Sequence, residues 1–177
     1  MKVEFTPDSV LGKALKDFWR GLKDDSGGRA ELRRCDNVNQ VKMTGVFSRF
    51  YNKLRKTPEG SSLGDTQMAV IVGLLSHLKF DAESEVLGGK APYEGYMVAK
   101  QLAKDVGGRP LVSELRFRRL LQNDRNDLYP AMLRIVRMTK GSINLYGLAH
   151  SIYYWGDGVK KTWAYAYFPV VPATKTA

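Results

Sequence analysis

The sequence predicts an all-α fold, and two observations carry that prediction. Apolar side chains recur at helical spacing in one segment after another. No run of useful length alternates apolar and polar residues as a half-buried strand does, and no hairpin dipeptide joins two such runs. A chain of 177 residues is long enough to bury a proper core, so we expect one domain or two small ones.

Four helices are expected in the N-terminal part, where a small bundle is the simplest architecture. The first starts around Ser9 and buries an apolar stripe that includes Leu15 and Trp19. The next three helices cover residues 29–34, 43–56 and 65–78. A polar turn is expected at 36–39. The helix at 65–78 is nearly uncharged, so we place it in the centre of the bundle.

Five further helices are expected in the C-terminal part. They cover about 94–105, 111–124, 128–140 and the two aromatic segments on either side of a break at 155–158. The aromatic residues of the last two segments, such as Trp163 and Tyr167, have helical spacing and are expected in the core rather than stacked on bases. Residues 173–177 are expected to form a frayed tail.

These helices are expected to form two small bundles that pack as one elongated protein. The N-terminal bundle covers residues 1–79 and the C-terminal bundle covers residues 94–177. The segment 80–93 is acidic and contains glycine and proline, so we expect a loop or linker there.

The charge of the chain is strongly basic and unevenly distributed. The net charge is +10, with +7 in residues 13–56, −4 in 57–96 and +6 in 100–140. This pattern favours a polyanionic partner, and nucleic acid before membrane, because no stretch is apolar enough to span a bilayer. The first residues lack the apolar run of a secretion signal, and the single cysteine, Cys35, excludes an internal disulfide. We therefore expect a cytoplasmic protein.

Rows of basic side chains lie on helix faces away from the apolar stripes: Arg118 and Arg119 point away from the apolar arc of their helix, and Arg116 flanks that arc. Guanidinium groups suit repeated contact with phosphate, so these residues are candidate nucleic-acid contacts. They are Arg20, Arg29, Arg33, Arg34, Arg49, Lys53, Arg116, Arg118, Arg119, Arg134 and Arg137. The competing interpretation is that these rows are the solvated faces of amphipathic helices.

Catalytic and metal-binding chemistry has little support in the sequence. The chain has two histidines, His77 and His150, and neither a phosphate-binding loop nor a dinucleotide fingerprint. Cys35 is better interpreted as a small packing residue than as half of a catalytic dyad with a histidine. Asp24-Asp25 is better interpreted as a solvated turn than as a magnesium site. We expect no enzyme activity, no cofactor and no metal. Base-reading motifs are also missing, so the expected binding is charge-driven and independent of base sequence.

Four stretches together resemble the CasB small subunit of the type I-E CRISPR surveillance complex Cascade. They are FWRGL with GGRAELRRC, SELRFRRLLQ, LRIVRM and YYWGDGVKKTWAYAYF, and the resemblance runs from about Leu11 to Phe168. It implies an all-helical protein of two small bundles without catalytic activity. The basic residues that match the four stretches are Arg29, Arg33, Arg34, Arg116, Arg118, Arg119, Arg134, Arg137, Lys160 and Lys161.

The resemblance also implies partners. Members of this family are present as two copies stacked head to tail, in contact with the crRNA-binding backbone subunits and the large subunit. Their basic face is thought to hold the displaced non-target DNA strand and stabilise the R-loop, with some contact to the crRNA–target side. Three alternatives stay open: a protein–protein scaffold whose arginines pair with acidic neighbours, a stand-alone helix-turn-helix DNA regulator, and a hydrolase built on Cys35.

Overall fold

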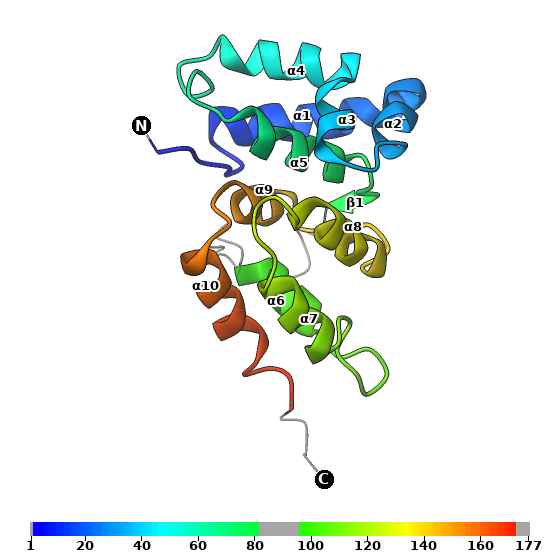
Figure 1. The fold of residues 1–177 in the computed structure, drawn as a ribbon, viewed down its shortest axis with the longest axis vertical. Helices are drawn as coiled ribbons and strands as arrows, with labels where there is room; N and C mark the ends of the chain where they lie inside the picture. The colour runs from blue at the N-terminus through cyan, green and yellow to red at the C-terminus, as the bar shows by residue number, and fades with distance from the viewer. Residues whose placement is uncertain (1, 82–95, 173–177) are drawn as a thin grey trace.

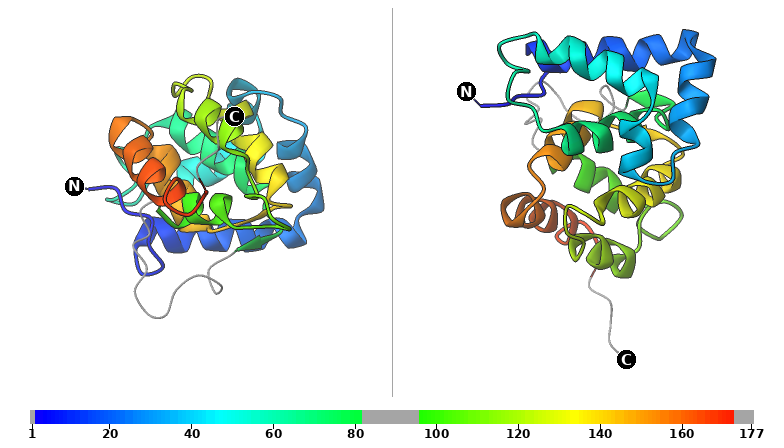
Figure 2. Two further views of the ribbon diagram at one scale, coloured as in Figure 1. Left: turned by 90° about the horizontal axis from the view of Figure 1, so that it is seen from below. Right: turned by 45° about the horizontal axis from the view of Figure 1, so that its top comes forward.

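The computed structural model describes residues 2–81 and 96–172 and is helical over most of both ranges, which confirms the all-α fold. The helices are α1 (Val10–Asp24), α2 (Ser26–Arg33), α3 (Val38–Lys42), α4 (Gly45–Arg55), α5 (Asp65–Leu75), α6 (Tyr96–Ala103), α7 (Glu114–Leu121), α8 (Leu128–Met138), α9 (Leu145–Tyr153) and α10 (Asp157–Tyr167). Helices α1 to α5 gather at one end of the molecule and α6, α7 and α10 at the other, with α8 and α9 between them (Figure 1; Figure 2).

Short polar side chains determine where several helices begin. The hydroxyl of Ser9 accepts a hydrogen bond from the backbone N–H of Gly12, at the start predicted for the first helix. Asp25, Thr44 and Asn144 accept corresponding bonds at the starts of α2, α4 and α9. Each of these bonds satisfies an N–H group that the helix itself leaves without a partner.

The prediction of a polar turn at 36–39 is wrong for its second half, because helix α3 begins at Val38. The side chain of Asn37 accepts a hydrogen bond from the backbone N–H of Gln40 at 3.0 Å, and Val41 is fully buried. An asparagine makes the same side-chain contact to the backbone in a turn and at a helix start, so the local sequence does not separate the two. The burial of Val41 in the core favours the helix.

Helix α5 is the central helix, as its lack of charge predicted. Every residue from Met68 to Leu75 is buried, and the helix contacts α3, α4, α8 and α9. At Gly73 a β-carbon would lie 2.8 Å from the ring of Tyr129 on α8. A glycine is therefore required for α5 and α8 to approach as closely as they do.

The chain leaving α5 is fixed to the turn that follows α8. Strands β1 (Phe80–Asp81) and β2 (Ser142–Ile143) pair in parallel, and the backbone N–H of Lys79 donates to the carbonyl of Gly141 at 2.9 Å. Gly141 has a φ of 77°, and a β-carbon there would lie 2.8 Å from the carbonyl oxygen of His77. No strand was expected, and a pair of two-residue strands is too short to produce an alternating pattern.

Most aromatic residues of the C-terminal helices form a core, as predicted, although Tyr165 of α10 is 75% exposed. The rings of Phe117 and Tyr167 stack with their centroids 3.8 Å apart, and the Tyr167 hydroxyl donates to the carbonyl of Val112 at 2.6 Å. The indole N–H of Trp163 donates to the hydroxyl of Ser151 at 3.1 Å. Buried tyrosine and tryptophan side chains therefore have their polar atoms satisfied, as the stability of such a core requires.

The division into two bundles stays a prediction. Buried side chains from both parts of the chain belong to one hydrophobic core, and α5 packs against α8 and α9. The expected loop at 80–93 lies outside the described residues from position 82 onward, and the expected tail at 173–177 lies outside them entirely.

Candidate nucleic-acid interface

Helices α7 and α8 form a groove with three arginines on its walls. Its volume is about 320 Å³. The lining residues are Arg116, Arg119, Leu120, Asn123, Ala131, Arg134, Ile135 and Met138. All three arginines are exposed, and in the described part of the chain none of them forms an ion pair. The groove therefore presents guanidinium groups that are free to bind an anion.

Arg118 belongs to a different face of α7. Its guanidinium forms an ion pair with Glu114, one turn earlier on the same helix, and lies 5.8 Å from the ring centroid of Phe168. The helical spacing grouped Arg118 with Arg119, whereas the structure brings Arg116 and Arg119 together on the groove. A step of about 100° per residue separates the two faces.

Arg29 and Arg33 meet the C-terminal end of α5. The Nε atoms of both arginines donate to the carbonyl of Ser76, at 3.0 Å and 2.8 Å, and Nη2 of Arg29 donates to the carbonyl of Leu78 at 2.9 Å. Cations stabilise the end of a helix, where carbonyl groups lack partners and the helix dipole is negative. Arg29 is half-buried, and burial with the nearby charge of Arg33 lowers its pKa.

His77 lies among these arginines and Arg137 of α8. Its burial, followed by the charges of Arg137, Arg33 and Arg29, lowers its pKa to about 4, so the imidazole is neutral at pH 7. Its Nε2 atom is buried and has no hydrogen-bond partner among the described residues. We call these four residues the His77 cluster.

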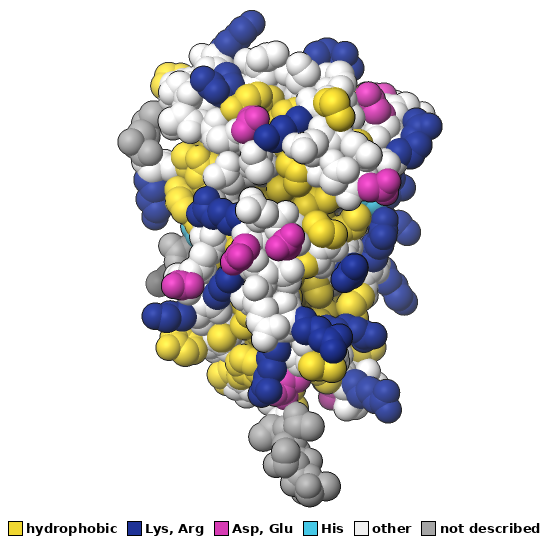
Figure 3. Space-filling model, in the orientation of Figure 1, with side chains coloured by type: hydrophobic (Ala, Val, Ile, Leu, Met, Phe, Trp, Pro, Cys, Tyr) yellow, Lys and Arg dark blue, Asp and Glu magenta, His cyan; other side chains and the backbone are white. Residues whose placement is uncertain are grey.

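The His77 cluster and the α7/α8 groove are joined through α8. Arg134 and Arg137 are three residues apart on that helix, so their side chains are neighbours on one face. We call the resulting row the arginine track, which consists of Arg33, Arg137, Arg134, Arg119 and Arg116. Figure 3 shows Lys and Arg side chains gathered along the right-hand edge of the molecule, over α2, α8 and α7. The track thus joins the consecutive helices α7 and α8 to α2, which is distant from them in the sequence.

Arg34 and Arg20 are exposed and lie outside the arginine track. The Nε atom of Arg34 donates to the carbonyl of Ala30 in its own helix, at 3.2 Å. Arg20 lies on α1. No contact of either residue in the described structure joins it to the α7/α8 groove.

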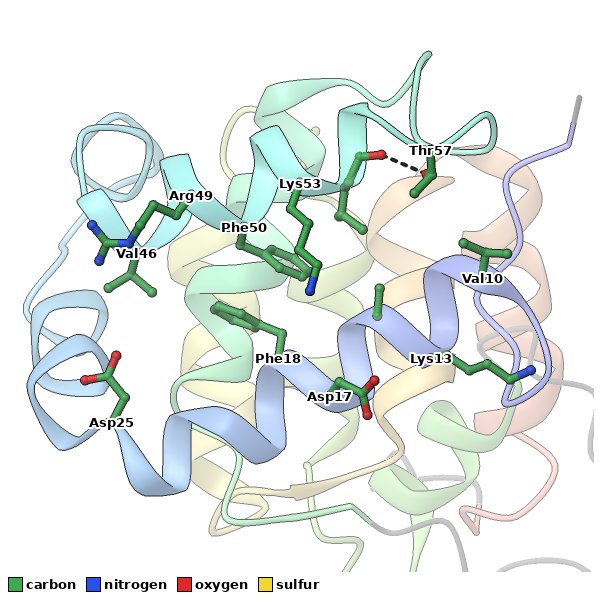
Figure 4. A pocket seen from close by; sticks show the side chains of 12 residues that line it. Val10, Lys13, Asp17, Phe18, Asp25, Val46, Arg49, Phe50, Lys53 and Thr57 are labelled. Carbon is green, nitrogen blue, oxygen red and sulfur yellow. Dashed lines mark hydrogen bonds between the residues drawn. The ribbon is translucent and has the colours of Figure 1, made fainter.

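Arg49 and Lys53 border a second groove, between α1 and α4. Its volume is about 650 Å³, and Figure 4 shows the rings of Phe18 and Phe50 on its floor, stacked with their centroids 4.2 Å apart. Lys13 lies on its rim as well. This groove is formed by other helices than the arginine track, so the structure does not bring all the predicted basic residues to one surface.

Lys160 and Lys161 lie on α10, which packs against α6. The Nζ atom of Lys160 is 5.8 Å from the ring centroid of Trp155, whereas Lys161 is exposed. Figure 1 places α10 on the left of the molecule and α8 toward its right. These two lysines therefore form a separate basic region.

His77 is the residue that sequence reasoning did not associate with the basic surface. It follows the apolar helix α5, where a histidine more often satisfies local hydrogen bonds, yet its Nε2 atom has no partner in the described structure. The arginines around it come from α2 and α8. No pattern within α5 itself could have indicated these neighbours.

The described residues contain no group of three or more His, Cys, Asp or Glu side chains arranged to hold a metal ion. In the same residues, no helix combines the length and apolar character needed to cross a membrane. These residues instead bring together arginine side chains, some bonded to backbone carbonyls and some without an ion-pair partner, and such a set can bind an anion.

Comparison with known proteins gives a match in sequence and one in fold. The family model for the CRISPR-associated protein Cse2 matches residues 28–168. No curated protein matches the chain. A chain in the crystal structure of E. coli Cascade bound to a PAM-containing double-stranded DNA target (32-nt spacer) has a similar fold, with a TM-score of 0.63 and 15% identity, covering 89% of this chain and 94% of that chain.

The matched range includes nearly all of α2, the whole arginine track and the aromatic C-terminal helices. The stretch FWRGL precedes the matched range, whereas GGRAELRRC from Gly28 onward and the other three stretches that carried the resemblance lie within it. Since the family model covers most of the sequence, this chain belongs to the CRISPR-associated Cse2 family, the CasB small subunits of type I-E Cascade.

Proposed function

We propose that this chain is a non-catalytic subunit that binds the sugar–phosphate backbone of nucleic acid along the arginine track. The proposed ligand is the displaced non-target DNA strand of the R-loop, with contact to the crRNA–target side as a secondary contribution. The observation that carries the proposal is the row of exposed arginines on α2, α8 and α7, which has no carboxylate partner in the described structure.

The charge of the track supports binding without base recognition. Guanidinium groups pair with phosphate oxygens in a forked geometry and give affinity that is independent of base sequence. The track carries no exposed aromatic side chain on which a base could stack, because the large aromatic side chains of the C-terminal helices are mostly in the core. This combination suits a surface that must hold any displaced sequence.

Binding of the displaced strand makes the free energy of R-loop formation more favourable. The exchange of a DNA duplex for an RNA–DNA duplex is nearly balanced, so a few kcal/mol from protein contacts shift it. If the track neutralises about four phosphates of a single strand, the logarithm of the affinity should fall with the logarithm of the salt concentration with a slope of about −3.

The partners proposed for this chain follow from its family and from the E. coli complex. That structure contains Cascade bound to double-stranded DNA. We propose that this chain contacts the crRNA-binding backbone subunits, the large subunit and a second copy of itself. We also propose that it acts in antiviral defence in the cytoplasm.

The proposal is tested by single-stranded DNA binding of the isolated chain, measured against salt concentration. The double variant Arg119→Gln/Arg134→Gln removes two track contacts, so the magnitude of the slope should fall by about 1.4. Arg118→Gln is the matched control, because it changes the same residue type on α7 but removes a side chain that is paired with Glu114. The control should keep the wild-type slope.

An unchanged slope in the double variant would refute backbone binding along the track. If that variant also assembles poorly with the other Cascade subunits, the arginines serve protein contacts and the scaffold alternative replaces our proposal. A DNA footprint with strong sequence preference would instead favour the stand-alone regulator.

A further inference from the structure

The His77 cluster brings positive charges together without an opposing carboxylate. The charged groups that act on the imidazole are Arg29 and Arg33 from α2 and Arg137 from α8, and no carboxylate of the described residues is among them. Like charges repel, so a cluster of this kind is unfavourable by itself and becomes favourable when an anion binds.

The Nε2 atom of His77 gives an independent indication of a ligand. It is buried and has no hydrogen-bond partner in the described structure, although buried polar atoms nearly always have one. The guanidinium groups around it have no acceptor atoms, so they cannot accept a hydrogen bond from an Nε2–H group. An anionic oxygen would satisfy both the imidazole and the arginines.

The surrounding backbone holds the site in place. The Nε atoms of Arg29 and Arg33 are fixed to the carbonyl of Ser76, and the N–H of Lys79 is fixed to the carbonyl of Gly141. Arg33 and Arg137 are nevertheless exposed, so their remaining N–H groups can reach a ligand from solvent. The two guanidinium groups are therefore held in place and stay accessible, and the half-buried imidazole of His77 must turn for its Nε2 atom to reach the same ligand.

We propose that Arg33, Arg137 and His77 together hold one backbone phosphate of the bound nucleic acid, and that His77 takes up a proton from solvent when this phosphate binds. The inference rests on the proposed function and adds to it a proton-linked contact. It identifies the end of α5 as the point where the strand passes from α2 to α8.

Phosphate binding and proton uptake by His77 are coupled because of the charges around the imidazole. In the free protein, burial and the three arginines lower the pKa of His77 to about 4. A bound phosphodiester contributes a negative charge beside the imidazole, which moves the pKa back toward its ordinary value of about 6.5. Over the range from pH 7.5 to pH 5.5 the affinity should then rise about tenfold.

The test measures the affinity of the full chain for an oligothymidylate at pH 7.5 and pH 5.5, at constant salt. Thymine and the phosphodiester keep their charges over this range, so the ligand does not contribute to the change. His77→Gln should lose the tenfold gain. His150→Gln should keep it, and this control is complete because the chain has only these two histidines.

A second measurement uses the wild-type chain and so does not depend on how the variants fold. The imidazole resonances of His77 are titrated by NMR with and without saturating oligothymidylate. The pKa of His77 should rise from about 4 to about 6.5 in the complex, while the resonances of His150 should show no such shift. Arg137→Gln should raise the pKa of His77 in the free protein, because it removes one of the three like charges.

Two results would overturn the inference. One is salt-dependent binding with the same affinity at both pH values, and the other is a pKa of His77 that stays about 4 in the complex. Either of them leaves the proposed function intact, because binding along the track persists. Absence of any salt-dependent binding would instead remove the proposed function itself.

Discussion

Arg29 and Arg33 share a face of α2, and we predict that replacing Arg29 affects folding much more than binding. Arg29→Met keeps most of the side-chain volume and removes the guanidinium. The side chain then loses its hydrogen bonds to the carbonyls of Ser76 and Leu78, which are 3.0 Å and 2.9 Å long. It also loses a cation at the C-terminal end of α5.

The size of the effect follows from what stays behind. The carbonyl of Ser76 keeps its bond from Nε of Arg33 at 2.8 Å, and the carbonyl of Leu78 keeps its bond from the indole of Trp19 at 3.1 Å. Neither acceptor is left unsatisfied, so the full penalty of an orphaned buried group does not apply. Relief of repulsion with Arg33 offsets part of the loss. We expect the free energy of unfolding to fall by about 1–2 kcal/mol.

Urea unfolding measures this change directly. With an m-value of about 2–3 kcal/mol/M, the midpoint should fall by about half a molar while m stays constant. Arg34→Met is the matched control, because the exposed Arg34 bonds only to the carbonyl of Ala30 in its own helix. Its midpoint should stay close to the wild-type value. Single-stranded DNA binding by Arg29→Met should keep the wild-type salt slope.

Two outcomes would refute this reasoning. An unchanged midpoint in Arg29→Met would mean that the carbonyl contacts at the end of α5 contribute nothing to stability. A salt slope reduced as much as in the track variants would mean that Arg29 contacts phosphate in spite of its bonds to the backbone.

Two further predictions concern packing and pH. Gly73→Ala should lower the free energy of unfolding by about 1–3 kcal/mol, because the new methyl group would lie 2.8 Å from the ring of Tyr129. Gly21→Ala, with nothing within 4 Å on the exposed side of α1, should raise it by about 0.5–1 kcal/mol, and urea unfolding of both variants checks the contrast. Stability should fall as the pH drops from about 6.5 toward 4, since the unfolded chain protonates its histidine before the folded one does. His77→Gln should flatten this part of the stability profile in thermal unfolding, and an unaltered profile would contradict the assignment.

The fold was predictable where a pattern within one segment decides the outcome. The uncharged run from Met68 to Leu75 required a central helix, and the helical spacing of Trp163 and Tyr167 required an apolar surface to pack on. The start of α3 was not predictable, because Asn37 fits a turn and a helix cap equally well. Burial of Val41 by residues far along the chain decided between them.

The candidate site was predictable only in part, because the partner of each arginine comes from another element. Helical spacing places Arg29 and Arg33, which are four residues apart, on one face of α2. The carbonyl that both of them bind belongs to Ser76, more than 40 residues further along the chain. Nothing in the sequence around α2 indicates that this face meets the end of α5.

Neighbouring arginines on one helix show why charge alone does not define the binding surface. Arg118 and Arg119 contribute equally to the net charge of +6 in residues 100–140. Arg118 is paired with Glu114, whereas Arg119 lies on the groove without a carboxylate partner in the described structure. A phosphate gains most from a guanidinium that loses no existing partner on binding, because an ion pair must otherwise be broken first. The arginines that bind nucleic acid should therefore be those that the fold leaves unpaired, and variants at Arg118 and Arg119 should separate in their salt dependence although their charge is the same.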